Sequence, residues 1–102
     1  MYIKIETTAK DKNNAREISK KIVDSQYSPC VQINKIHSLY LWNGIKESKE
    51  YKIVIKTTEN HFKEIIKIIK SINDYNVPEI IKSKFSIDEK DYENWFLKNI
   101  KK

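Results

Sequence analysis

The sequence predicts an α+β domain of the ferredoxin-like kind: a βαββαβ antiparallel sheet with helices on one face, followed by a C-terminal helix. Three observations predict this fold. Four segments alternate like strands, two longer segments have helical apolar spacing, and an Asn-Gly pair separates the second and third strands. A chain of 102 residues fits one domain and is short for two. We therefore predict a single domain over residues 1–102.

The first strand and first helix follow from their apolar periods. Residues 2–8 alternate, with Ile3 and Ile5 on one face. Asp11 can cap the helix that follows, because its side chain can accept a bond from the first turn. The helix carries an apolar stripe formed by Ala15, Ile18, Ile22 and Val23. It should end near Gln26, because Pro29 disfavours helical geometry just before it.

A long β-hairpin is predicted in the middle of the chain. Residues 30–42 form its first strand, and the apolar side chains on both faces of 38–42 suit a strand that is covered on two sides. Asn43-Gly44 predicts the turn, because a type I′ turn requires positive φ at both central residues. The return strand alternates, with one face formed by Tyr51, Ile53, Ile55 and Thr57.

The last part of the chain predicts two helices and one strand. Thr58 can cap a second helix that stops by Asn73 and whose buried stripe is Phe62, Ile65, Ile66, Ile69 and Ile72. A fourth strand is expected over residues 79–87, with Pro78 at its start. Asp88 then begins a short third helix that carries Tyr92, Trp95, Phe96 and Ile100.

Composition excludes several classes of protein. The net charge is +6, but 19 of the 20 basic residues are lysines, and nucleic-acid readers rely on arginine. We therefore expect a solvated lysine surface and no nucleic-acid partner. The longest apolar run is Leu39 to Trp42, so we expect no membrane partner either, and residues 1–6 lack the apolar core of a signal peptide. Cys30 is the single cysteine, which predicts the reducing cytoplasm.

The aromatic residues of the hairpin predict contact with other subunits. A sheet face that carries Tyr40, Trp42 and Tyr51 would be an aggregation liability if it stayed in water. These rings could instead form a base-stacking platform, but the basic-Gly-aromatic motif of RNA-recognition modules is absent. We therefore expect neighbouring copies of the chain to cover this face.

Few residues could carry chemistry. Cys30, His37 and His61 could bind a metal, but no two of them have the spacing of a metal-binding motif. We expect Cys30 to be a small buried residue, His61 to lie on the surface, and His37 to be solvated or to line a cleft. The carboxylates at residues 88, 89 and 91 are better explained as helix-capping groups than as an acid–base pair.

Five segments, in chain order and nearly in register, match a known pattern: Pro29-Cys30-Val31-Gln32-Ile33, Ser38-Leu39-Tyr40-Leu41-Trp42-Asn43-Gly44, Ile55-Lys56-Thr57, Tyr75-Asn76-Val77-Pro78-Glu79-Ile80-Ile81 and Tyr92-Glu93-Asn94-Trp95. Together they resemble the CutA family of divalent-cation tolerance proteins. The resemblance implies a cytoplasmic, non-enzymatic homotrimer that requires no cofactor and is linked to divalent metal ions, with copper as a candidate ligand. It also implies that the hairpin forms the trimer interface, with Tyr40, Trp42 and Tyr51 as contact residues.

The chain departs from the family where some bacterial members are assigned copper ligands. Thr7, Ile72 and Asn73 occupy those places, and none is a good ligand for a soft metal. Cys30 therefore remains as the metal candidate.

Two other functions stay open at this stage. A trimer similar to the nitrogen-regulatory PII proteins would act in signalling and bind an anion or nucleotide in inter-subunit clefts through Lys56. An enzyme would use Tyr75 and Glu79 in the same clefts as acid–base groups.

Overall fold

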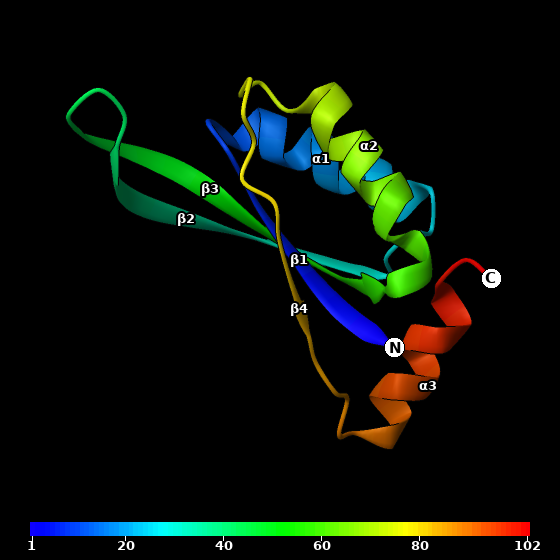
Figure 1. Ribbon diagram of the computed structural model, residues 1–102. Helices are drawn as coiled ribbons and strands as arrows, with labels where there is room; N and C mark the ends of the chain where they lie inside the picture. Colours follow the sequence, from blue (N-terminus) through cyan, green and yellow to red (C-terminus); the bar gives the residue numbers. More distant parts are fainter.

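Four antiparallel strands form one sheet in the order β2-β3-β1-β4, and helices α1 and α2 pack together on one face of it (Figure 1). The computed structural model describes residues 1–102. Its elements are β1 (Tyr2–Ala9), α1 (Lys12–Asp24), β2 (Cys30–Leu41), β3 (Ile45–Thr58), the 3-10 turn η1 (Glu59–His61), α2 (Phe62–Ile72), β4 (Ile81–Lys84) and α3 (Lys90–Asn99). The predicted fold class and order of elements are confirmed. None of the helices is long and apolar enough to span a membrane.

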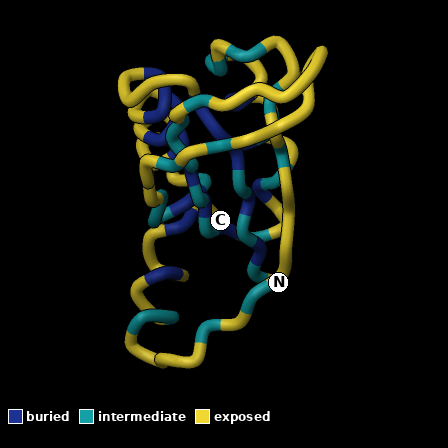
Figure 2. Tube along the Cα trace, turned by 90° about the vertical axis from the view of Figure 1, so that its left-hand side faces the viewer, coloured by how far each residue is buried: buried dark blue, intermediate teal, exposed yellow.

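The hydrophobic core lies between the helices and one face of the sheet. Alternation in β1 and β3 directs Ile3, Ile5, Ile53 and Ile55 to this side, where they meet the apolar stripes of both helices. In Figure 2 these buried residues gather in the middle of the molecule, while the hairpin and the loops are largely exposed. Each fully buried isoleucine contributes roughly 1.5–3 kcal/mol, so this one-sided core supplies most of the stability of a single chain.

Asn14 joins the two helices through buried polar contacts. Its Nδ2 donates a hydrogen bond to the Ile72 carbonyl over 3.0 Å, and its Oδ1 accepts one from the Asp74 N–H over 3.1 Å. Asn73 continues the connection, because its Nδ2 donates to the Thr8 carbonyl over 2.9 Å. The end of α2 is thereby attached to both α1 and β1, which fixes where the following segment crosses the end of the sheet.

The hairpin turn differs from the predicted two-residue turn. Asn43 and Gly44 do have positive φ, at 55° and 99°. However, Leu41 pairs with Ile45, so Trp42 also belongs to the loop, and its N–H donates to the Gly44 carbonyl over 2.8 Å. A two-residue type I′ turn would have paired Trp42 with Ile45. The Asn-Gly signal therefore located the turn correctly but gave the wrong register.

Two element boundaries were predicted wrongly. Thr58 does not cap α2: it still pairs with Tyr2 in the sheet, its side chain makes no capping bond, and η1 intervenes before α2 begins at Phe62. The fourth strand is also shorter than residues 79–87. It pairs only over Ile81–Lys84. At one end the chain leaves the sheet after Phe85, where β1 itself begins, and at the other end residues 79 and 80 stay unpaired although β1 continues to Ala9.

The C-terminal helix packs against the start of β1. Phe96 is fully buried, and its ring meets the edge of the Tyr2 ring at a centroid distance of 5.5 Å. The following residues then cover His61, whose Nε2 lies 2.7 Å from the Lys101 carbonyl oxygen. His61 is therefore buried, and the prediction that it lies on the surface is wrong. The cause is a chain end 40 positions away, which helix periodicity does not reveal.

Replacement of Asn14 by alanine should lower the free energy of unfolding by about 2 kcal/mol, because two backbone groups would lose their buried partners. Asn13→Ala is the matched control, since Asn13 is its exposed neighbour on the same helix. Urea unfolding of both variants at one protein concentration would measure the difference. Equal midpoints would show that Asn14 does not connect the helices.

Candidate functional site

The β2–β3 hairpin extends beyond the helices and exposes apolar side chains (Figure 1). Leu41 is 79% exposed and Ile45 77% exposed, and Leu39 and Trp42 are exposed beside them. Apolar side chains concentrated in this way mark a contact surface on a protein. The hairpin cannot bury them against its own chain, because α1 and α2 lie over the other end of β2 and β3.

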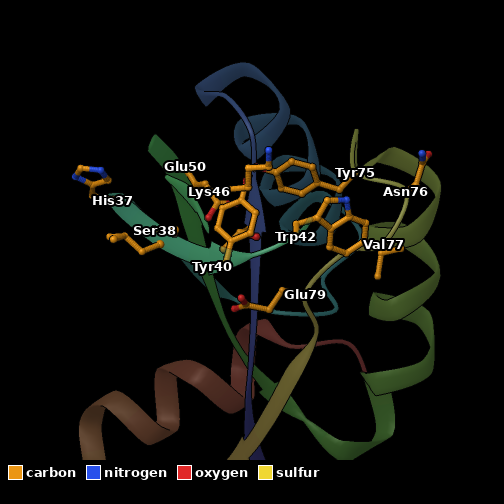
Figure 3. Close-up of a pocket in the computed structure, with 12 residues that line it drawn as sticks. His37, Ser38, Tyr40, Trp42, Lys46, Glu50, Tyr75, Asn76, Val77 and Glu79 are labelled. Atoms are coloured by element: carbon orange, nitrogen blue, oxygen red, sulfur yellow. The ribbon is translucent and has the colours of Figure 1, made fainter. Parts of the chain in front are cut away.

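An open pocket of about 810 Å³ lies at the base of this hairpin. Its walls come from the hairpin, from the end of β1 and from the segment that follows α2. Figure 3 shows the rings of Tyr40, Trp42 and Tyr75 around the pocket, with Glu79 on one side of it and His37 at its edge. The pocket therefore unites the predicted cleft residues Tyr75 and Glu79 with two of the three predicted interface aromatics.

Tyr75 is held in the pocket by a hydrogen bond to the hairpin. Its hydroxyl donates to Glu50 Oε1 over 2.8 Å. Burial, and then this bond, raise the pKa of the Tyr75 phenol well above its ordinary range. The phenol therefore stays protonated at neutral pH and is a poor proton acceptor. This arrangement suits a structural contact between the hairpin and the segment after α2, and it argues against the acid–base role considered for Tyr75.

Tyr51 and Lys56 lie away from this pocket. Tyr51 is on the helix-facing side of β3 and packs, half-buried, against the core, so it does not share a face with Tyr40. Lys56 is on the opposite side of β3 and lines a second hollow near the start of α3. Within one chain the structure therefore does not bring Lys56 together with Tyr75 and Glu79.

No group of three or more His, Cys, Asp or Glu side chains could hold a metal ion. Cys30 is half-buried rather than fully buried as expected. It lies beside Tyr92, and burial, followed by this thiol, raises the pKa of the Tyr92 phenol. His37 is exposed and pairs with Glu47, with 2.7 Å between Nε2 and Oε2. This placement agrees with the expectation that His37 is solvated or lines a cleft.

The residues at the family's copper positions do not fit a copper site. Thr7 is buried among core isoleucines, and its Oγ1 has no hydrogen-bond partner. Ile72 offers no donor atom, and the Asn73 amide already bonds to Thr8 and Tyr75. A soft metal ion would find no thiolate or imidazole among these three side chains.

Sequence reasoning missed the partner of Tyr75. That partner is Glu50, and no sequence signal connects it to a tyrosine 25 positions later. Lys4 was also missed as a neighbour of Lys56, although their pairing in the β1–β3 ladder places both on one face. Alternation could have predicted their faces but not which strands are adjacent.

Comparison with known proteins gives one consistent family. The family described as "CutA1 divalent ion tolerance protein" matches residues 3–99. The divalent-cation tolerance protein CutA of Pyrococcus horikoshii is 30% identical over 97 residues, which cover 94% of this chain and 95% of that protein. The structure of the divalent cation tolerance protein from Thermus thermophilus is 28% identical, covers 99% of this chain and 100% of its own, and has a TM-score of 0.90.

A third relative bears on cellular location. The structure of a CutA protein from Archaeoglobus fulgidus, described as periplasmic, is 25% identical, covers 99% of this chain and 100% of its own, and has a TM-score of 0.92. The predicted cytoplasmic location therefore does not follow from relatedness alone.

The raised pKa of Tyr75 predicts a pH dependence of stability. The contribution of its neutral phenol is complete below about pH 10, the pKa of an unfolded tyrosine, and is lost as the pH rises from there through the higher folded-state pKa. Tyr75→Phe has no phenol to ionise. Its melting temperature should therefore fall less than that of the parent chain between pH 9 and pH 11, roughly the window around that pKa. A constant difference across this range would show that Tyr75 titrates normally.

Proposed function

The chain belongs to the CutA1 divalent ion tolerance family, and we propose that it performs this role as a homotrimer without catalysing a reaction. The exposed hairpin is the single observation that supports assembly most strongly. Its apolar side chains have no partner in one chain, and the same hairpin forms most of the pocket at its base. A second and third copy would remove these side chains from water, a gain of roughly 25 cal/mol per Å² of apolar surface.

The edge of the sheet also supports self-association. β2 is an edge strand of 12 residues, and one of its sides has no strand partner. A long edge strand with apolar residues invites pairing with another chain, and proteins usually cover such edges. We propose that Tyr40 and Trp42 contact the neighbouring copies directly, and that Tyr51 supports the hairpin from the core side.

We place any direct contact with a divalent metal ion at Cys30. Its thiol is the only one in the chain, and copper favours such soft donors. Because one chain has no group of three ligating side chains, an ion held at Cys30 would take further ligands from water or from other copies. In this proposal the metal is bound reversibly and is not a resident cofactor.

The alternative signalling function is not favoured. The matching family and the relatives compared are described as divalent-cation tolerance proteins, and none of them carries a PII-type description. The enzymatic alternative loses support because burial, and then the hydrogen bond to Glu50, keep Tyr75 in its neutral form. We retain a reducing cytoplasmic location as part of the proposal, because Cys30 has no second cysteine with which to pair.

Light scattering should find a particle with three times the chain mass of 12.2 kDa at low micromolar concentration. Leu41→Asp should shift the population to smaller species, because it would place a charge in the buried contact. Val23→Asp is the matched control, since Val23 is an exposed apolar residue on α1, outside the hairpin. A well-folded monomeric parent would overturn the assembly proposal.

Titration calorimetry with copper should detect binding to the parent chain that Cys30→Ser weakens by at least about tenfold, because a hydroxyl is a poor ligand for a soft metal. His37→Gln is the comparison variant, since His37 is the most exposed imidazole. Equal affinity in the parent and Cys30→Ser would remove Cys30 from the proposal. Weakening by His37→Gln alone would place the ion at the hairpin.

A further inference from the structure

We propose that the second hollow, beside the start of α3, binds a small oxyanion with two negative charges through Lys4 and Lys56. The hollow has a volume of about 470 Å³, large enough for a phosphate or a small dicarboxylate. The two lysines form one wall, and the rings of Phe85 and Tyr92 with the segment 86–89 form the others. The pocket is built within one chain, and it adjoins the proposed metal site, because Cys30 is the cross-strand partner of Lys56 and lies beside Tyr92. Anion binding is therefore measured without added metal.

The two lysines carry positive charge that the sheet does not neutralise. Lys4 and Lys56 are direct cross-strand partners, so both half-buried side chains project from the same face. Like charges in this position destabilise a sheet. Lys52, on the same face, pairs with Glu6 over 3.0 Å, but neither Lys4 nor Lys56 forms an ion pair. A bound dianion would supply the missing counter-charge to both.

The segment before α3 adds neutral donors to the same hollow. The backbone N–H groups of residues 86–88 make no hydrogen bond within the chain. They lead into a helix of 10 residues, whose N-terminal end favours negative charge. The Tyr92 hydroxyl also lies on this wall.

Two carboxylates also line the hollow and oppose an anion. Glu89 is occupied as the cap of α3, because its Oε2 accepts from the Tyr92 N–H over 2.9 Å. Asp88 accepts only a long contact of 3.4 Å from the Ser86 hydroxyl. Asp88 should therefore reduce the affinity for an anion without blocking the site. Removing its charge should raise the affinity, whereas removing either lysine charge should lower it.

The hollow opens on the sheet face that α1 and α2 leave uncovered, the face that neighbouring copies would cover under the proposed function. Anion binding is therefore tested on the assembled protein, and the state of assembly is followed by a separate measurement.

Titration of the chain with inorganic phosphate, and separately with succinate, would test the site and separate phosphate from carboxylate recognition. Lys4→Gln and Lys56→Gln should each weaken phosphate binding about tenfold, because each removes a charge-assisted hydrogen bond. Lys84→Gln is the matched control, an exposed lysine on the other face of the sheet with no ion pair. Asp88→Asn should tighten binding several-fold.

Two further measurements make the result decisive. Without anion, Lys4→Gln should melt at a higher temperature than Lys84→Gln, because it relieves the repulsion across the strands. With phosphate, the amide resonances of residues 86–88 should shift in nuclear magnetic resonance spectra. The proposal would be overturned if Lys84→Gln weakened phosphate binding as much as Lys4→Gln does. It would also be overturned if neither anion bound. Light scattering of the same samples would report separately whether the trimer forms.

Discussion

The register of the β1–β3 ladder is the constraint on which the rest of this structure depends. Pairing of Ile5 with Ile55 directs the isoleucines of both strands towards α1 and α2. The same pairing sets Lys4 opposite Lys56 on the other face. A slip by one residue would exchange these faces, placing lysines in the core and isoleucines in water. One register thus gives the sheet an apolar face, which forms the core, and a charged face that carries the unpaired Lys4 and Lys56.

The one-sided core and the uncovered hairpin are the grounds for the proposed assembly. The helices cover only the portion of the sheet near β1, and β2 and β3 continue beyond them into an apolar hairpin. No residue of the chain is placed to cover Leu41 or Ile45. An exposed apolar hairpin on an edge strand is stable in solution only if something shields it. The chain belongs to the CutA1 family, and divalent ion tolerance is the role attached to that family.

Two connecting segments create both hollows. Asn14 and Asn73 fix the end of α2, so that Tyr75 reaches Glu50 on the hairpin. Residues 86–89 turn away from β4 and close the hollow above Lys56. Both segments lack regular secondary structure, which is where binding residues commonly lie on a rigid scaffold. The strands supply the charges and rings, and the segments determine which of them meet.

The sequence by itself determined the fold class, the order of elements and the core-facing isoleucines of β1 and β3, because apolar periods of two and 3.6 residues are local properties of the chain. The five matching segments also determined the family. Only the tertiary structure decided that His61 is buried by the C-terminus, that Trp42 belongs to the hairpin loop and that Lys56 is separated from Tyr75. Each of these depends on contacts between distant segments or on strand register, and local patterns do not encode which segments become neighbours.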